Sequence, residues 1–176
     1  MLALLLFGQN ITKDEIGKTR LAPDAWVATY WTGSVHFSAP TTLTPFAVLK
    51  SGRMIHFTSF DGQYHHGGII PEGGMEVFAQ FWGDAIGESA EKAIADEAKF
   101  SRIISRSKID LLGQASTQVV YETDYFGLFQ QVTTVVYFER DSKIYMFTMV
   151  VRKEDTTRKE LTGIFEKLLQ SVRFVN

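Results

Sequence analysis

Two nearly continuous apolar runs, residues 135–138 and 144–151, constrain the fold more than any other feature of this sequence. The polar segment 139–142 connects them. A strand that is apolar on both faces is covered on both faces, and a short polar connection favours an antiparallel hairpin. Residues 128–139 and 143–151 are therefore predicted to be adjacent antiparallel strands in the middle of a sheet that is covered on each side.

A helix is predicted after Gly87, with Ser89 as its N-cap and its end near residues 105–107. Its small and apolar residues recur at helical spacing: Ala90, Ala93, Ile94, Ala98, Ile103 and Ile104. Four basic residues fall at or just after its predicted end, where they would complement the helix dipole: Lys99, Arg102, Arg106 and Lys108. We prefer this interpretation to a nucleic-acid patch.

A second helix follows the apolar runs, and Thr157 with Glu160 three residues later fits a capping box. Its apolar residues form one face: Leu161, Ile164, Phe165, Leu168 and Leu169. Residues 171–175 then alternate between polar and apolar, which predicts a short terminal strand.

The remaining strands are predicted from alternation and from breaker residues. Residues 35–38 alternate and stop near Pro40, which suits a short edge strand. Residues 53–60, 75–82 and 117–124 are predicted to be further strands.

Composition bounds the class of protein. The chain has 176 residues, which is one ordinary domain. A net charge of −2 provides no global positive field, so we expect no nucleic-acid partner. The absence of cysteine excludes disulfides, a thiol nucleophile and cysteine-ligated zinc.

The N-terminus is apolar over residues 2–7, far fewer than the roughly 20 residues that span a bilayer, so no transmembrane segment is expected there. The run resembles the end of a signal peptide. Residues 1–8 are therefore expected to be a signal-peptide remnant, 9–30 an arm and 31–176 a single domain. An extracytoplasmic location, periplasmic or secreted, is expected. The alternative is a cytoplasmic protein whose first residues are a strand or an exposed tail.

Three local patterns resemble one superfamily. Residues 31–40 have an aromatic residue, a strand and a proline; residues 112–115 read Leu-Gly-x-Ala; and residues 168–174 read Leu-Leu-x-Ser-x-x-Phe. Over residues 30–176 the chain resembles the PsbP, Ran-binding Mog and DcrB-like proteins. The resemblance implies an α+β fold, namely an α/β/α sandwich with a central, mainly antiparallel sheet and helices on both faces. It also implies a non-enzymatic protein-binding or assembly role, and it supplies no catalytic residue and no cofactor.

The Gly-rich loop 61–74 holds the adjacent pair His65 and His66, with Asp61 and Glu72 nearby. Imidazole and carboxylate groups are ligands for zinc, copper or nickel, and paired carboxylates can serve acid–base catalysis. An enzyme or a metal-dependent catalyst is therefore one alternative. The chain lacks a Gly-x-Ser-x-Gly elbow and a phosphate-binding loop, and we prefer a solvated loop that binds no metal.

Aromatic residues suggest a binding surface instead. They gather in the turn 124–129 and at the start of loop 61–74. Aromatic side chains are enriched at the centres of protein interfaces, although aromatics in strands more often belong to the core. The predicted binding residues are Tyr64, His65, His66, Tyr125 and Phe126. We expect a protein partner, and a carrier of a small apolar ligand remains a further alternative.

Overall fold

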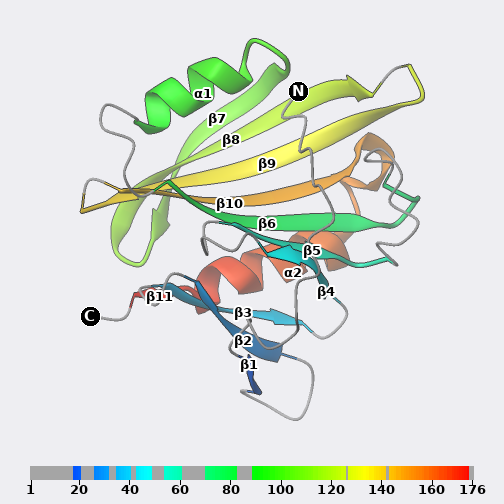
Figure 1. Ribbon diagram of the computed structural model, residues 1–176. Coiled ribbons are helices and arrows are strands. Elements are labelled where there is room, and N and C mark those ends of the chain that lie inside the picture. The colour runs from blue at the N-terminus through cyan, green and yellow to red at the C-terminus, as the bar shows by residue number, and fades with distance from the viewer. Residues whose placement is uncertain are drawn as a thin grey trace.

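The structure is a computed structural model of the whole chain (Figure 1). It describes residues 18–20, 26–31, 35–40, 43–48, 54–60, 70–82, 89–125, 127–141 and 143–174.

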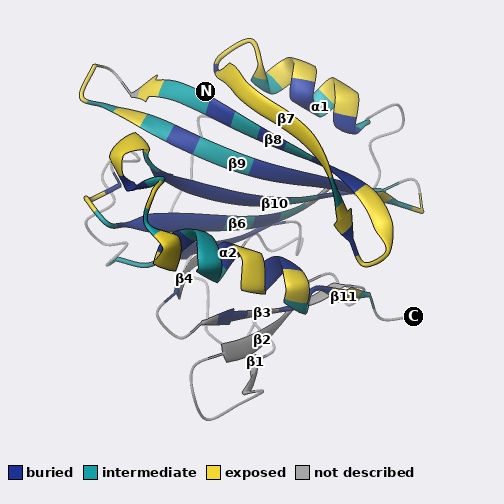
Figure 2. Cartoon of the chain, turned by 180° about the vertical axis from the view of Figure 1, so that it is seen from behind, coloured by how far each residue is buried: buried dark blue, intermediate teal, exposed yellow. Residues whose placement is uncertain are grey.

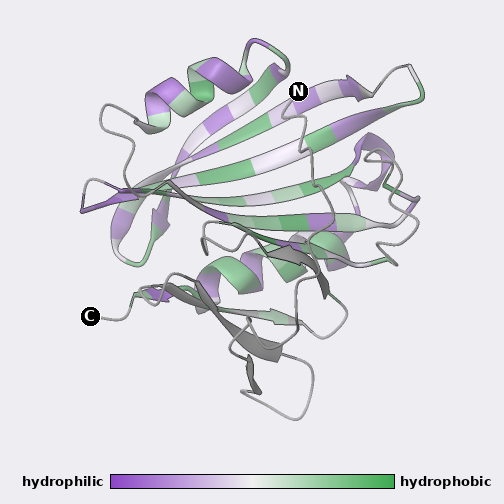
Figure 3. Cartoon of the chain, viewed as in Figure 1, coloured by the Kyte–Doolittle hydropathy of each residue, from purple (hydrophilic) through white to green (hydrophobic). Residues whose placement is uncertain are grey.

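The larger of two sheets has seven strands, and every neighbouring pair in it is antiparallel. In spatial order its strands are β4 (Thr44–Val48), β5 (Met54–Thr58), β6 (Met75–Trp82), β10 (Lys143–Arg152), β9 (Phe129–Arg140), β8 (Gln114–Tyr125) and β7 (Arg102–Leu111). Figure 3 shows hydrophobic residues along β6, β9 and β10, in the middle of this sheet.

The predicted central hairpin is confirmed. β9 and β10 pair in register from Lys143 opposite Arg140 to Arg152 opposite Gln131, and β10 is the middle strand of the seven. The connecting residue Asp141 has a φ of 52°, a left-handed conformation that tight turns use. The neighbouring residues Val135 and Val136 are both buried, so β9 is covered on both faces, as its apolar sequence predicts.

A smaller sheet has four strands, β1 (Lys18–Arg20), β2 (Trp26–Trp31), β3 (Val35–Pro40) and β11 (Arg173–Phe174), in that order. The predicted terminal strand is confirmed as β11. The prediction that residues 35–38 are an edge strand is wrong, because β3 pairs with β2 on one side and with β11 on the other. The C-terminal strand adds to this sheet from a distant part of the chain, and local alternation could not reveal that.

The first helix is shorter than predicted. α1 (Ala90–Glu97) begins at Ser89, whose hydroxyl accepts a hydrogen bond from the N–H of Lys92, so the predicted N-cap is confirmed. The predicted end near 105–107 is wrong: a turn follows Glu97, and Ile103 and Ile104 belong to β7. The ladder of backbone hydrogen bonds to β8 fixes these residues as a strand, and the helical spacing of two isoleucines does not outweigh it.

The basic residues after α1 therefore have different roles from those predicted. Arg102, Arg106 and Lys108 lie along β7 instead of at the end of a helix. Their side chains contact Glu122, Glu91 and Thr117 respectively.

The second helix, α2 (Lys159–Ser171), buries the predicted apolar face: Leu161, Phe165, Leu168 and Leu169. The predicted capping box is wrong. The N-cap is Arg158, which makes no capping hydrogen bond with its side chain, and Thr157 lies in the turn that follows the short 3-10 helix η3 (Lys153–Asp155). Within the described residues, no helix is long and apolar enough to cross a membrane.

The two helices join different clusters of buried side chains. α2 packs with β3, β5, β6, β9 and β10, where the rings of Phe37, Phe57 and Phe147 meet edge to face. α1 contributes Ala90 and Ile94 to a smaller cluster on β8, β9 and β10. An α+β fold built on an antiparallel sheet is thus confirmed.

Candidate binding surface around Arg152

The structure leaves most of the predicted binding residues undescribed. Tyr64, His65, His66 and Phe126 lie outside the described residues. Tyr125 is the last residue of β8 and pairs with Phe129, but its side chain is not described. The structure does describe the C-terminal end of loop 61–74 and most of the turn 124–129, and these two segments form the candidate surface.

The described end of the loop is a tight turn. The N–H of Gly74 donates to the carbonyl oxygen of Pro71 at 2.9 Å, and Gly73 has a φ of 71°. A Cβ on Gly74 would lie 2.8 Å from the Pro71 oxygen, closer than a side chain can approach. Both glycines are therefore required by the backbone of this turn.

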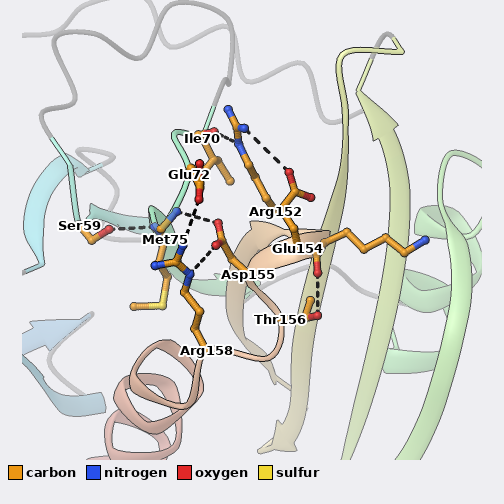
Figure 4. Close-up of polar contacts among 11 residues, drawn as sticks. Ser59, Ile70, Glu72, Met75, Arg152, Glu154, Asp155, Thr156 and Arg158 are labelled. Carbon is orange, nitrogen blue, oxygen red and sulfur yellow. Dashed lines mark hydrogen bonds and ion pairs between the residues drawn. The ribbon is translucent and has the colours of Figure 1, made fainter.

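A buried carboxylate holds this turn in place (Figure 4). Asp155 is 1% exposed, and it accepts a hydrogen bond from the N–H of Gly73 at 2.7 Å. Its other oxygen lies 2.6 Å from Nε of Arg158, and the guanidinium of Arg158 also lies 3.3 Å from the carboxylate of Glu72. A buried charge is tolerated when it is paired and hydrogen-bonded, which this arrangement provides. We call Glu72, Gly73, Asp155 and Arg158 the Asp155 clamp.

Arg152, the last residue of β10, contacts both segments. Its Nε donates to the carbonyl oxygen of Ile70 at 2.6 Å, at the end of the loop. The same guanidinium lies over the ring of Phe129, 4.8 Å from the ring centroid, at the end of the turn. This distance is within the range of a cation–π contact. One side chain therefore brings together the two segments that the sequence analysis combined into one surface.

The turn 124–129 presents an apolar tip. Asp124 accepts a hydrogen bond from the N–H of Gly127 at 2.6 Å, and Gly127 has a φ of 71°. Leu128 follows and is 69% exposed, the largest exposed fraction among the large hydrophobic residues that the structure describes. The conformation of the turn thus directs a leucine into solvent.

Charged residues lie beside this tip. Lys153 donates to Oε1 of Gln130 at 2.5 Å and lies 2.8 Å from the carboxylate of Glu122. Arg102 lies 2.5 Å from the other oxygen of Glu122. Hydrogen bonds from Lys153 and then Arg102 hold the pKa of the Glu122 carboxyl below its usual range.

A second polar site lies away from this surface. His56 on β5 and Glu76 on β6 are buried, with 3.6 Å between Nε2 and Oε1, and the His56 ring stacks on Phe78 with centroids 4.1 Å apart. That separation exceeds a hydrogen bond. The sequence analysis placed His56 on a strand but gave it no role. The two side chains are at most 6% exposed, so a substrate could not reach them without a rearrangement.

The metal hypothesis concerns residues that are mostly undescribed. Asp61, His65 and His66 lie outside the described residues, while Glu72 is ion-paired with Arg158. In the described parts of the chain, no three His, Cys, Asp or Glu residues are grouped so that they could hold a metal ion.

The sequence analysis missed Arg152, Asp155 and Arg158. Arg152 and Asp155 belong to the charged run 152–155, which directly follows the apolar strand. Pattern alone does not say that a residue of this run is buried.

No protein-family model and no curated protein matches the sequence. Several solved structures do match. The Ran-binding protein Mog1p of Saccharomyces cerevisiae aligns with a TM-score of 0.56 at 7% identity, over 92% of this chain and 96% of its own. The cyanobacterial PsbP (CyanoP) of Synechocystis sp. PCC 6803 gives 0.55 at 10% identity, over 89% of this chain and 96% of its own.

A protein of Bacteroides thetaiotaomicron gives a TM-score of 0.53 at 10% identity, over 84% of this chain. Our chain spans only 47% of the length of that structure. At such identities the shared property is the fold. The predicted resemblance to the PsbP and Mog proteins is thus confirmed as a likeness of fold.

Proposed function

We propose that this chain is a non-enzymatic protein-binding module. Its docking surface combines loop 61–74 with the turn 124–129, including the predicted residues Tyr64, His65, His66, Tyr125 and Phe126. The observation that carries the proposal is the position of Arg152, which contacts Ile70 at the end of the loop and Phe129 at the end of the turn.

The chemistry around Arg152 supports this surface. Protein interfaces combine an apolar centre with a polar rim, and a few aromatic, Arg or other large residues carry most of the binding energy. Leu128 is an exposed apolar residue of the turn, and Gln130, two residues further along the chain, accepts a hydrogen bond from Lys153. The Asp155 clamp fixes the base of the loop, which lowers the entropic cost of binding.

The likeness of fold supports the same class of function by analogy. Mog1p, which shares the fold, is a Ran-binding protein. The enzyme hypothesis would use Glu72 as an acid or a ligand, and Glu72 is already ion-paired with Arg158.

The proposal includes the layering of the domain as an α/β/α sandwich, with α1 and α2 on opposite faces of the seven-stranded sheet. Successive residues of β9 support it. Val135 and Tyr137 join the cluster of α1, whereas Val136 and Phe138 join the cluster of α2. Neighbouring residues in a strand point to opposite faces.

The proposal also includes export, because residues 2–7 are apolar as in the end of a signal peptide. Residues 1–8 would then be removed, leaving the arm 9–30 and the domain 31–176. N-terminal sequencing of the native protein tests this, since a mature chain should start near Gln9. An intact Met1 on protein from the cytoplasm would contradict export.

Capture of the partner from native extract, followed by mass spectrometry, tests the docking surface. A double substitution, Tyr125→Ala with Phe126→Ala, should leave the domain folded and weaken capture of the identified partner by at least ~2 kcal/mol if either residue is a hot spot. If the double variant unfolds, both aromatics belong to the core and the surface is misassigned.

A matched pair of leucines sharpens this test. Leu128 and Leu112 are both exposed, and they lie in the turns at opposite ends of β8. Asn tolerates the left-handed backbone of Leu112, so both positions are changed to Asn. Leu128→Asn should weaken binding, whereas Leu112→Asn should not. Equal effects would contradict the proposed surface.

A further inference from the structure

β7 is an unusually exposed edge strand. It ends the strand order of the seven-stranded sheet, and all of its ten residues except Ile109 and Leu111 are exposed (Figure 2). Among the described strands, only β8 pairs with it. An edge strand presents a row of backbone N–H and C=O groups that another strand can pair with.

The part of β7 that can accept another strand is its C-terminal half. A bulge lies between Ile103 and Ser105 and interrupts the pairing with β8. From Ser105 to Leu111 the register with β8 is regular, each residue facing one partner. Bulges protect edges against pairing, so the regular segment 105–111 is the available part.

The charged residues of this segment differ in their hydrogen-bond and ion-pair partners within the chain. Arg106 forms an ion pair with Glu91. Lys108 donates to the neutral hydroxyl of Thr117 at 2.8 Å, and Asp110 accepts from the backbone N–H of Gly113 at 3.0 Å. Lys108 and Asp110 therefore carry opposite charges whose described hydrogen-bond partners are neutral.

The spacing of these charges favours pairing of β7 with β7 of a second copy of the same chain. When two identical strands pair antiparallel about a two-fold axis, residues equally distant from the axis face each other. An axis at Ile109 places Lys108 of each copy opposite Asp110 of the other, on one face of the extended sheet. It also places Ile109 opposite Ile109 and Ser107 opposite Leu111.

Axes at four other positions within the regular segment place like charges opposite each other. An axis at Arg106, Lys108 or Asp110 pairs that residue with itself, and an axis at Ser107 pairs Arg106 with Lys108. Like charges directly opposite each other destabilise an antiparallel pair, whereas opposite charges stabilise it. Among these positions, only the axis at Ile109 has complementary charges.

We infer that β7 is a self-association edge through which two copies of this chain pair antiparallel about Ile109, giving one sheet that continues across both. The paired segment is short, roughly five residues on each copy, so the dimer is reversible and depends on protein concentration.

Charge exchange tests the register by sedimentation velocity. Lys108→Asp and Asp110→Lys should each weaken self-association by roughly tenfold or more, because each replaces two attractive cross-strand pairs by two repulsive ones. A mixture of the two variants should regain the dimer, since the two acidic side chains of one variant then face the two basic side chains of the other. Wild-type chain that is monomeric at every concentration tested, or a mixture that stays monomeric, overturns the proposal.

Cysteine cross-linking is a second test of the proposed register, and it remains available if Asp110→Lys fails to fold. The chain contains no cysteine, so a single introduced cysteine can form a disulfide only between two copies. Ile109→Cys should cross-link on mild oxidation, because the two cysteines face each other at a distance that a disulfide spans. Ser107→Cys, on the same strand and face, should not, because it faces Leu111. Equal cross-linking of both variants contradicts the register.

Discussion

The carboxylate of Asp155 accepts a hydrogen bond from the backbone N–H of Gly73, although 82 residues separate the two in the chain. This contact joins the end of the Gly-rich loop to the residues that precede α2. Arg152 makes a parallel connection, since its side chain binds the carbonyl oxygen of Ile70 over the same separation. The base of the candidate surface is therefore built by the end of β10 and the residues that follow it before α2.

Removing the Asp155 carboxylate should destabilise the domain. Asp155→Ala leaves the Gly73 N–H and the Arg158 guanidinium without this acceptor, and we expect a loss of about 2–3 kcal/mol in the free energy of unfolding. Glu154→Ala is the matched control, because that carboxylate is 56% exposed, and it should change stability by less than about 0.5 kcal/mol. Urea titrations that give equal losses would show that the clamp has no energetic role.

Two glycines should respond in opposite ways to the same substitution. Gly74→Ala places a methyl group 2.8 Å from the Pro71 oxygen and should cost about 1–3 kcal/mol. Gly163→Ala within α2 meets nothing within 4 Å and should stabilise the domain by about 0.5–1 kcal/mol. Thermal unfolding followed by circular dichroism measures both. A stable Gly74→Ala variant would mean that the turn is not formed as described.

Substitutions of two phenylalanines test whether the apolar face of α2 is packed in the core. Phe165 is 4% exposed in the cluster of α2, and Phe165→Ala should cost roughly 3–5 kcal/mol. Phe100 is 63% exposed after α1, and Phe100→Ala should cost less than about 1 kcal/mol. A denaturant titration in which Phe165→Ala loses less than about 1 kcal/mol would indicate that the apolar face of α2 is not packed.

The interaction of Glu122 with Lys153 and Arg102 should appear as a pH dependence of stability. Because these partners lower the pKa of Glu122 in the folded state, the interaction contributes fully above the ordinary glutamate pKa of about 4.3 and is lost as the pH falls through the lower folded value. Glu122→Gln should therefore be less stable than wild type near neutral pH and approach it in acid.

Urea midpoints measured across the acid range test this, with Glu166→Gln on an exposed position of α2 as the control. A constant difference between wild type and Glu122→Gln at every pH would show that the interaction does not depend on the charge of the carboxylate.

The sequence predicted the elements that local pattern determines. The central hairpin follows from two apolar runs with a short polar connection, and the buried face of α2 follows from helical spacing. It could not predict what depends on distant partners. Residues 102–111 became a strand because β8 pairs with them, and residues 35–40 became an inner strand because β11 returns to them.

The candidate surface also combines features that local sequence predicts with contacts that depend on distant residues. Residue types alone indicated an aromatic turn and a Gly-rich loop. The sequence analysis joined the two into one binding surface because both carry aromatic residues. The contacts that link their described ends come from Arg152, and Asp155 holds the end of the loop; both residues belong to a charged segment to which the sequence analysis gave no role. A charged residue that is buried by long-range pairing leaves no periodic signal, since its burial depends on partners 82 residues away.

Metal binding is the competing explanation for loop 61–74, and thermal stability can separate the two hypotheses. A ligand that binds only the folded state raises the melting temperature, and the stabilisation grows with the logarithm of the ligand concentration relative to its dissociation constant. If the loop is a protein-docking segment, added zinc or copper should leave the melting temperature of wild type unchanged, and His65→Ala with His66→Ala should weaken capture of the partner only slightly. If either metal raises the melting temperature of wild type and not that of the histidine double variant, the metal hypothesis replaces ours.

Glu72→Gln serves as a further control. A metal site that uses Glu72 would lose affinity for the metal in this variant. The loss of the 3.3 Å contact between Glu72 and the partly exposed Arg158 should by itself have little effect on stability.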